Sequence, residues 1–385
     1  MQFTCSTSSL LQALQLTSRA ISGQQALPIL GNILLQAKDD RCTLSATDLE
    51  LSIVTAIPAN VETAGSVTVP AKAILNFAQF TSDAEVTITV KDGTQVHCRA
   101  AHGKTVLSGE AASNYPSISM VESERSFSVD GATLLDALHY VTFASAKSSL
   151  RPVLSGVSLR AEDGHIVFVA TDSYRLSEYS IKADAPKDLA CIIPVKVLDE
   201  LKVLLAGKKL PKRTPTEEAE PEGARSEALP VTVVLGAQQI ELRVGETHLL
   251  SRLIEGTFPD YRQIIPKEHA LTALLPLKDL TTAVRRMHYF AKEVNNTLTF
   301  SFTPGQVQIT TPQTPIGKDE ATIAVEGLHS EGKIALSSGY LLDFLTHAEG
   351  EAVTLHMVDS MHPAVFHLPG NDHLLHLVMP LRMQE

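Results

Sequence analysis

Residues 46–48 read Ala-Thr-Asp at the end of a strand-like run, and the same three residues return at 170–172 in the same setting. The two copies are 124 residues apart. Three ordered markers at one spacing indicate a tandem structural repeat, and such a repeat decides the architecture before any single motif does. The other two markers with this spacing are LGNILL at 30–35 with LSGVSL at 154–159, and VPAK at 69–72 with IPVK at 193–196.

A third, fainter copy follows in the same order. A helical pattern begins near Leu277, strand-like runs occupy 298–302 and 307–311, and a second helical pattern opens at 337–340. We therefore predict three domains, at residues 1–122, 123–266 and 267–385.

The second copy is longer than the first because of the segment 208–230. This segment contains four prolines, a basic run and then an acidic run, so it offers little to bury. We expect an exposed loop or a disordered insert there.

Each copy has the order helix, strands, helix, strands. Apolar residues recur every three or four positions in the helical patterns, so each helix should bury one face. The strand-like runs are short and alternating, and Asp92-Gly93 between two of them favours a tight hairpin turn. The predicted class is α+β, with two helices packed on antiparallel sheet in each domain. The predicted helices are 10–21, 71–81, 133–147, 195–207, 277–293 and 337–349.

Antiparallel sheets can end in open edges, and similar neighbouring modules can pair those edges across domain boundaries. The repeat therefore favours an arc or a closed ring. The sequence alone leaves the number of chains open.

Composition places the chain in the globular class, with 385 residues of which 44% are hydrophobic and 19% charged. The net charge of −11 argues against a protein that coats nucleic acid through bulk positive charge. The sequence offers neither a leader pattern nor an apolar run long enough to span a bilayer, so we expect a soluble, cytoplasmic protein with no membrane partner. The cysteines Cys5, Cys42, Cys98 and Cys191 are far apart and are expected to be small buried thiols.

Signatures of catalysis are missing from the sequence: it has no GxSxG, HExxH, phosphate-binding GxxxxGK[ST] or GxGxxG motif. Asp48 and Asp172 occupy equivalent strand ends, where an aspartate commonly accepts hydrogen bonds from backbone N–H groups in a turn. Histidines concentrate near the C-terminus, but their irregular spacing does not favour a metal site. We predict no catalytic residue, no metal and no cofactor. These histidines are His347, His356, His362, His367, His373 and His376.

Positive charge is concentrated on the six predicted helices, where Lys and Arg outnumber Asp and Glu, whereas the chain as a whole is acidic. Diffuse positive charge without an aromatic stacking platform suits loose, sequence-independent contact with DNA phosphates. Ordinary solvated helix faces explain the same charge equally well.

The motifs and the repeat together resemble one known family, the bacterial replicative sliding clamp, which is the β subunit of DNA polymerase III. The resemblance covers essentially the whole chain. It implies three similar domains per chain, two chains closing head to tail into a ring around duplex DNA, and a non-catalytic role in processivity. The residues that carry it are LPILGN at 27–32, ATDLEL at 46–51, VPAK at 69–72, ATDSYRL at 170–176, EGTFPDYRQIIP at 255–266 and VMPLR at 378–382.

The resemblance also implies a peptide-binding cleft between the second and third domains. Its partners would be the catalytic subunit of DNA polymerase III, the clamp loader, and other polymerases and repair proteins that carry peptides with Gln, Leu and Phe. Arg175 and Arg382 would meet an acidic rim or a peptide carbonyl, and Pro380 should end the last strand. The implied cleft residues are Leu154, Thr171, Ser173, Tyr174, Arg175, Leu176, Pro259, Gln263, Ile264, Ser337, Tyr340, Met361, Val378, Met379, Pro380, Leu381 and Arg382.

Two further sets of residues are expected from the ring. The DNA-facing set is Gln24, Lys72, Lys147, Lys196, Lys202, Arg285 and Arg286. The dimer interface joins the edge strand at 104–108, with Lys104 and Leu107, to the helix that carries Tyr289 and Phe290.

The chain departs from the family pattern in a few places. Family members often have Gly-His where this chain has Ser173-Tyr174, and an Arg where it has Gln263; some have an aromatic at Asn295 and an Arg at Gln24. These differences leave the preferred peptide open. Two other interpretations also stay open: a scaffold of the same fold that does not encircle DNA, and a hydrolase that uses the Thr-Asp positions or the C-terminal histidines.

Overall fold

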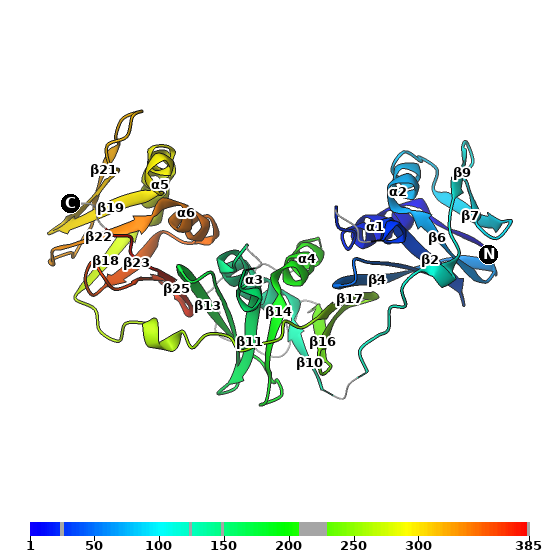
Figure 1. The fold of residues 1–385 in the computed structure, drawn as a ribbon, viewed down its shortest axis with the longest axis horizontal. Helices are drawn as coiled ribbons and strands as arrows, with labels where there is room; N and C mark the ends of the chain where they lie inside the picture. The colour runs from blue at the N-terminus through cyan, green and yellow to red at the C-terminus, as the bar shows by residue number, and fades with distance from the viewer. Residues whose placement is uncertain (24–26, 123–124, 148–149, 208–228, 383–385) are drawn as a thin grey trace, which may run out of the picture. The chain divides into compact units, whose positions relative to one another are not determined.

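The computed structural model describes residues 1–23, 27–122, 125–147, 150–207 and 229–382 (Figure 1). These residues form two compact units. The first holds residues 1–131, 203–207 and 229–253, and the second holds 132–202 and 254–382. The division passes through the second copy of the repeat.

The first unit contains two helices, α1 (Thr7–Ser18) and α2 (Ala71–Gln79), which pack against each other. Its five-stranded sheet has the order β5 (Asn60–Thr63), β1 (Gln2–Ser6), β7 (Glu85–Lys91), β8 (Gln95–Arg99), β9 (Lys104–Ser108). Its eight-stranded sheet has the order β10 (Ser126–Asp130), β15 (Pro230–Leu235), β16 (Gln239–Val244), β17 (Thr247–Arg252), β4 (Leu51–Pro58), β3 (Arg41–Thr47), β2 (Asn32–Lys38), β6 (Gly65–Pro70).

The second unit holds α3 (Gly131–Val141), most of α4 (Val195–Ala206), α5 (Leu277–Ala291) and α6 (Ser338–His347). Helices α5 and α6 lie side by side (Figure 1). The eight-stranded sheet has the order β14 (Ala190–Pro194), β11 (Gly156–Glu162), β12 (His165–Thr171), β13 (Arg175–Lys182), β25 (Asn371–Val378), β24 (Ala364–Leu368), β23 (Ala352–Met357), β18 (Leu271–Pro276). The four-stranded sheet has the order β21 (Glu320–Ala324), β20 (Gln306–Thr310), β19 (Thr297–Thr303), β22 (Gly332–Ser337).

The element order confirms the threefold repeat and the α+β class. A strand, a helix, a group of strands, a second helix and three strands follow one another three times along the chain. Neighbouring copies share sheets, since β17 pairs with β4 and β13 pairs with β25, both antiparallel. This pairing across copies is the edge pairing that the sequence predicts.

Local turns also follow the sequence. In the hairpin between β7 and β8, Asp92 and Gly93 both have positive φ, 50° and 79°, as a tight hairpin turn requires. At the equivalent strand ends, Leu49 and Ser173 have φ of 78° and 79°. The backbone therefore repeats as closely as the sequence does at these positions.

Two predicted helices differ from the structure: α1 spans Thr7–Ser18, three residues earlier than the predicted 10–21, and the predicted helix 133–147 is too long. Helix α3 ends at Val141 and continues only as a 3-10 turn, Thr142–Ala144, so Lys147 lies beyond the helix. The Phe143 carbonyl accepts a hydrogen bond from Arg175 Nη2 at 2.8 Å instead of serving a longer helix. This contact with a distant strand lies just beyond the helix end, and the local pattern does not contain it.

The core is aromatic and aliphatic, with Phe3, Phe168, Phe300, Phe344 and Phe366 among its fully buried side chains. Three of the four cysteines are buried and Cys191 is partly buried; all four are free thiols. Burial raises the pKa of Cys5 and of Cys98 to about 12, which keeps both thiols protonated and unreactive. Within the described part of the chain, none of the helices combines the length and apolar character needed to cross a membrane.

Candidate functional site

The turn between β12 and β13 is built by its own side chains. Thr171 Oγ1 donates to the Arg175 carbonyl at 2.6 Å, and Asp172 Oδ1 accepts from the backbone N–H groups of Tyr174 and Arg175 at 2.9 and 3.0 Å. Asp48 accepts the equivalent bonds in the first copy of the repeat. The predicted structural role of both aspartates is confirmed.

Arg175 is buried, with 3% of its side chain exposed, and it joins three elements. Its Nε donates to Asp172 at 3.1 Å, its Nη1 to Asp343 on α6 at 2.6 Å, and its Nη2 to the Phe143 carbonyl at 2.8 Å. The guanidinium is therefore already engaged. With three of its five N–H groups bound to protein oxygens and 3% of its side chain exposed, Arg175 supports the surface from behind, and its direct contact with a peptide stays a prediction.

Two tyrosines form an aromatic surface above Arg175. The rings of Tyr174 and Tyr340 are stacked, with centroids 6.3 Å apart and planes 16° apart. The Arg175 guanidinium carbon lies 4.8 Å from the centre of the Tyr340 ring, at cation–π distance. Tyr174 is 59% exposed, so the stack presents a free aromatic face to solvent.

The end of the chain runs beside this aromatic surface. Strand β25 pairs with β13, so that Val378 lies opposite Arg175, and the Met379 N–H then donates to the Tyr174 carbonyl at 2.8 Å. The strand ends at Val378, two residues before Pro380, in agreement with the prediction. The Leu381 N–H donates to the Ala335 carbonyl of β22 at 2.8 Å, which fastens the segment to the neighbouring sheet.

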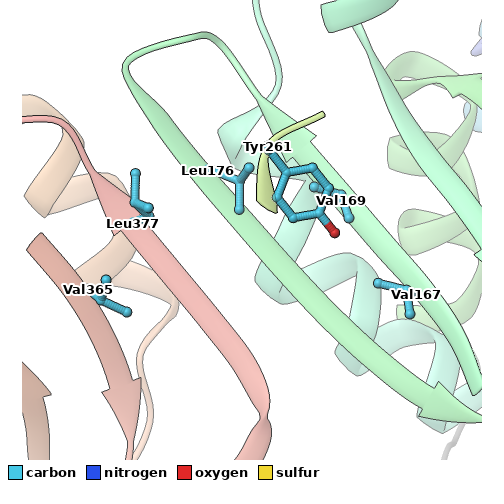
Figure 2. Packing of buried hydrophobic residues seen from close by; sticks show 6 residues of the cluster. All are labelled: Val167, Val169, Leu176, Tyr261, Val365 and Leu377. Atoms are coloured by element: carbon cyan, nitrogen blue, oxygen red, sulfur yellow. The ribbon is translucent and has the colours of Figure 1, made fainter. Parts of the chain in front are cut away.

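Met379 also contacts an apolar cluster on one face of the eight-stranded sheet. Figure 2 shows side chains of the cluster on β12, β13, β24 and β25, together with Tyr261. Tyr261 belongs to the strap, which we define as residues 255–266. The cluster is Val167, Val169, Leu176, Tyr261, Val365 and Leu377, with Phe258, Ile265, Leu375 and Met379 packed against it.

Polar contacts hold the strap on the sheet. The Tyr261 hydroxyl donates to Glu178 and accepts from Arg160, while Arg262 forms an ion pair with Glu162. Burial and the nearby Glu178 carboxylate raise the pKa of Tyr261, which stays a neutral donor. A cavity of about 360 Å³ lies between Arg160, Glu162 and strap residues 258–262.

The expected cleft residues fall into two groups. One group is buried and supports the surface from behind: Leu154, Thr171, Arg175, Leu176, Ser337 and Val378. The other group is exposed or half-buried: Ser173, Tyr174, Pro259, Gln263, Ile264, Tyr340, Met361, Met379, Pro380, Leu381 and Arg382. Contacts bring together the 171–176 turn, Tyr340 and the 378–381 segment, and Arg151 links the Leu154 turn to Ser173 at 3.3 Å.

Sequence reasoning missed the supporting residues Asp343, Phe143 and Glu178. Asp343 lies three positions after Tyr340 on α6, and residues three apart share a helix face. That spacing is a usable signal for Asp343, whereas the Phe143 carbonyl leaves no trace in the sequence.

The expected DNA-facing side chains are mostly exposed. Lys72, Lys147, Lys196 and Arg285 are exposed, as is Arg286, which forms a two-bond ion pair with Asp319 at 2.8 and 2.9 Å. Half-buried Lys202 contacts Asp199 at 2.9 Å and Thr142 at 2.6 Å. Gln24 and residues 208–228 of the predicted insert lie outside the described residues.

The expected interface residues lie on two different units. Lys104 is exposed on β9, the last strand of its sheet, and Tyr289 is 68% exposed on α5 with Phe290 edge-on to it at 5.5 Å. Leu107 is only 9% exposed, whereas Val106 is 49% exposed. The expectation that Leu107 supplies the outer apolar contact is wrong, because side chains alternate along a strand and Leu107 points into its own core.

The C-terminal histidines do not converge on a point. Within the described ranges, no three His, Cys, Asp or Glu side chains are placed to hold a metal ion. His376 is fully buried and stacks on Phe344 at 4.4 Å, while His356 and His367 lie on neighbouring strands.

Comparisons with known proteins agree with the repeat. Three family models match the chain: the N-terminal domain of the DNA polymerase III beta subunit at residues 1–119, its central domain at 128–212 and its C-terminal domain at 262–382. A beta sliding clamp of Synechocystis is 28% identical over the full length of both chains.

Solved structures are similar over the full length of both chains as well. The DNA polymerase sliding clamp of Bacillus subtilis matches with a TM-score of 0.90 at 25% identity. A Pseudomonas aeruginosa sliding clamp bound to griselimycin matches with a TM-score of 0.88 at 27% identity.

Proposed function

The chain belongs to the family of DNA polymerase III beta subunits, the bacterial sliding clamps, and we propose that it closes with a second copy into a ring that encircles duplex DNA without sequence specificity. Its place in DNA replication is that of a non-catalytic processivity subunit. We place it in the cytoplasm, and we propose that its domains are residues 1–122, 123–266 and 267–385.

The surface around Tyr174, Tyr340 and Met379 is proposed to tether partner proteins. Its partners would be the catalytic subunit of DNA polymerase III, the clamp loader, and other polymerases and repair proteins that carry Gln/Leu/Phe peptides. The exposed Tyr174–Tyr340 stack, fixed from behind by buried Arg175, is the observation that carries this proposal. A rigid aromatic face beside an adaptable methionine is typical of a binding hot spot. The griselimycin-bound clamp of P. aeruginosa supports the expectation that clamps of this family bind ligands.

DNA would be held by enclosure more than by affinity. Exposed Lys72, Lys147, Lys196 and Arg285 supply positive charge for phosphates. Arg286 pairs with Asp319, and Lys202 pairs with Asp199. Since the chain carries a net charge of −11, we expect weak binding to short linear duplex that falls steeply with salt.

Ring closure would join the first unit of one chain to the second unit of its neighbour. Strands β9 and β21 are each the last strand of their sheets, so both offer unpaired backbone groups. Exposed Val106 on β9 of the first unit and Tyr289 on α5 of the second unit supply apolar area, which supports a head-to-tail contact.

Truncation of the C-terminus tests the tethering proposal. Removing residues 379–385 deletes Met379 and the two backbone hydrogen bonds to Tyr174 and Ala335, and it should abolish binding of a fluorescent Gln/Leu/Phe peptide while self-association persists. Removing only Gln384 and Glu385 is the matched control and should change affinity less than about tenfold, or ~1.4 kcal/mol. Full affinity after the longer deletion would mean that the peptide binds elsewhere.

A further inference from the structure

The first unit contains a cavity of about 370 Å³ on the face of its eight-stranded sheet. It lies between strands β2, β3 and β4 and residues 112–120, which we call the first strap. Its volume lies within the range of ligand-binding pockets, about 300–1,000 Å³.

This cavity repeats the position of the cavity in the second unit. Gln36 lines the first and Arg160 lines the second, and these two residues are separated by the repeat spacing of 124. Each cavity also has a strap tyrosine in its wall, Tyr115 in the first unit and Tyr261 in the second. The two cavities are therefore equivalent features of the fold.

Their chemistry differs. In the second unit, Glu162 pairs with Arg160 at 3.2 Å and with Arg262, and Arg160 lies 3.7 Å from Glu178. The charged side chains at this cavity therefore pair with one another. In the first unit, the positions of Arg160 and Glu178 are occupied by Gln36 and Val54, and none of the described lining residues is charged. The first cavity thus lies at the position equivalent to that of the second cavity, but its lining residues are uncharged.

The first strap is fastened at both ends and at Tyr115, in the middle. Glu110 exchanges two backbone hydrogen bonds with Thr68 at 3.0 Å, and the Val121 N–H donates to buried Glu241 at 2.8 Å. The Tyr115 hydroxyl donates to the Asn32 carbonyl and accepts from the Thr47 N–H, both at 3.2 Å. A site held in this way is preformed, which lowers the entropic cost of binding.

The wall pairs apolar area with neutral hydrogen-bonding groups. Leu34, Ile118 and Met120 supply the accessible apolar area, and Gln36 and Thr43 supply an amide and a hydroxyl group, whereas Val54 and Ser45 form the buried floor at 6% and 3% exposure. Met120 is 41% exposed and can adjust its shape to an entering side chain. A charged ligand would lose hydration there without meeting an opposite charge, whereas a neutral amide would find donors and acceptors.

We propose that this cavity is a second binding site, which takes an uncharged peptide segment of a partner protein with an aliphatic side chain. The apolar wall would receive the side chain, and Gln36 and Thr43 would bind the peptide amides. The site goes beyond the proposed function, because it uses no residue of the Tyr174–Tyr340 surface and requires neither the ring nor DNA.

Methyl NMR on the full chain tests the proposal, with N-acetyl-leucinamide as the probe. The chain has seven methionines, and Met120 reports on the first-unit cavity while Met361 and Met379 report on the tethering surface. We expect N-acetyl-leucinamide to shift the Met120 methyl signal until the site is saturated. Charged N-acetyl-lysinamide, followed by the same signal, should bind at least tenfold more weakly.

Gln36 offers a matched pair of variants. Gln36→Arg places in the first cavity the charge that Arg160 carries in the second, and it should weaken the probe at Met120 at least tenfold. Gln36→Leu keeps the wall neutral but removes the Gln36 amide as a hydrogen-bonding partner, so it should weaken the probe by about threefold, clearly less than Gln36→Arg does. Gln36 is exposed, so both variants are expected to keep the fold, and a thermal unfolding transition unchanged from wild type would verify it.

The outcomes separate this site from the tethering surface. A linear, unsaturable drift of all methionine signals, or equal binding by Gln36→Arg and wild type, would overturn the second site. Loss of Gln/Leu/Phe peptide binding at Met361 and Met379, with the Met120 response intact, would count against the proposed tethering surface and leave the second site standing.

Discussion

His376 is a fully buried imidazole in the second unit, and neither ring nitrogen has a hydrogen-bond partner among the described residues. Its ring lies parallel to that of Phe344 at 4.4 Å, with an interplanar angle of 3°. Burial, followed by the positive charge of Arg175 and the nearby His347, holds the pKa of His376 well below its usual range. His376 therefore stays neutral in the folded protein and contributes as an aromatic packing group.

We predict that His376 makes the fold sensitive to acid. The unfolded chain binds a proton at the ordinary histidine pKa of about 6.5, whereas the folded chain does not. Stability is therefore full above pH ~6.5 and falls as the pH drops below that value, by at most ~1.4 kcal/mol per pH unit for this group. Thermal unfolding of wild type between pH 7.5 and 5 should show the loss.

His376→Phe should flatten that dependence, because phenylalanine preserves the aromatic stack and binds no proton. His347, whose pKa is also lowered mainly by burial, will leave a residual slope. If thermal stability falls equally with decreasing pH in His376→Phe and in wild type, the assignment of acid sensitivity to His376 is contradicted.

At the scale of elements, Arg175 ties β13 to α6 and to the turn after α3. We predict that Arg175→Met lowers the free energy of unfolding by about 3 kcal/mol, the lower end of the cost of breaking a buried ion pair, because Asp343 remains partly solvated. Urea unfolding measures this change. Arg285→Met on the exposed face of α5 is the control and should cost less than ~0.5 kcal/mol.

If Arg175→Met lowers the free energy of unfolding by less than ~0.5 kcal/mol, the contact between β13, α6 and the turn after α3 is held by apolar packing alone. A further variant, Asp343→Asn, should weaken the same joint without removing the contact to Phe143. The two variants combined should lose less than the sum of their separate losses, since they remove one shared interaction.

The sequence predicts the elements well where the information is local. Helices α2 and α6 end within two residues of the predicted ends, and the Asp92-Gly93 turn and the Asp172 turn form as expected. Helix α3 stops at Val141, and just beyond it the Phe143 carbonyl binds distant Arg175, a contact that no local pattern reveals.

Ambiguous patterns account for the other misses. Strand β9 has apolar residues at both Val106 and Leu107, so alternation alone cannot tell which one faces solvent. At the candidate site, motif resemblance identified Tyr174, Tyr340 and Met379, but the support from Asp343 and Glu178 depends on contacts between residues far apart in sequence.

For the whole molecule, self-association is the property to measure first. We predict that Tyr289→Ala combined with Phe290→Ala weakens the dimer, because it removes the exposed aromatic pair from α5. Native mass measurement should show wild type at twice the 41.5 kDa chain mass and the variant as single chains at nanomolar concentration. An unchanged native mass would place the interface elsewhere.

Retention on circular DNA tests the central claim, enclosure of duplex DNA, most directly. The protein is mixed with nicked circular plasmid at a low concentration and then concentrated, so that the chains can close around the DNA. Washing in high salt should then remove protein that is held only by charge. We predict that protein stays on the circles in about 1 M salt and leaves after a single cut linearises them. Equal retention on circular and linear DNA, or complete loss from both, would contradict the ring.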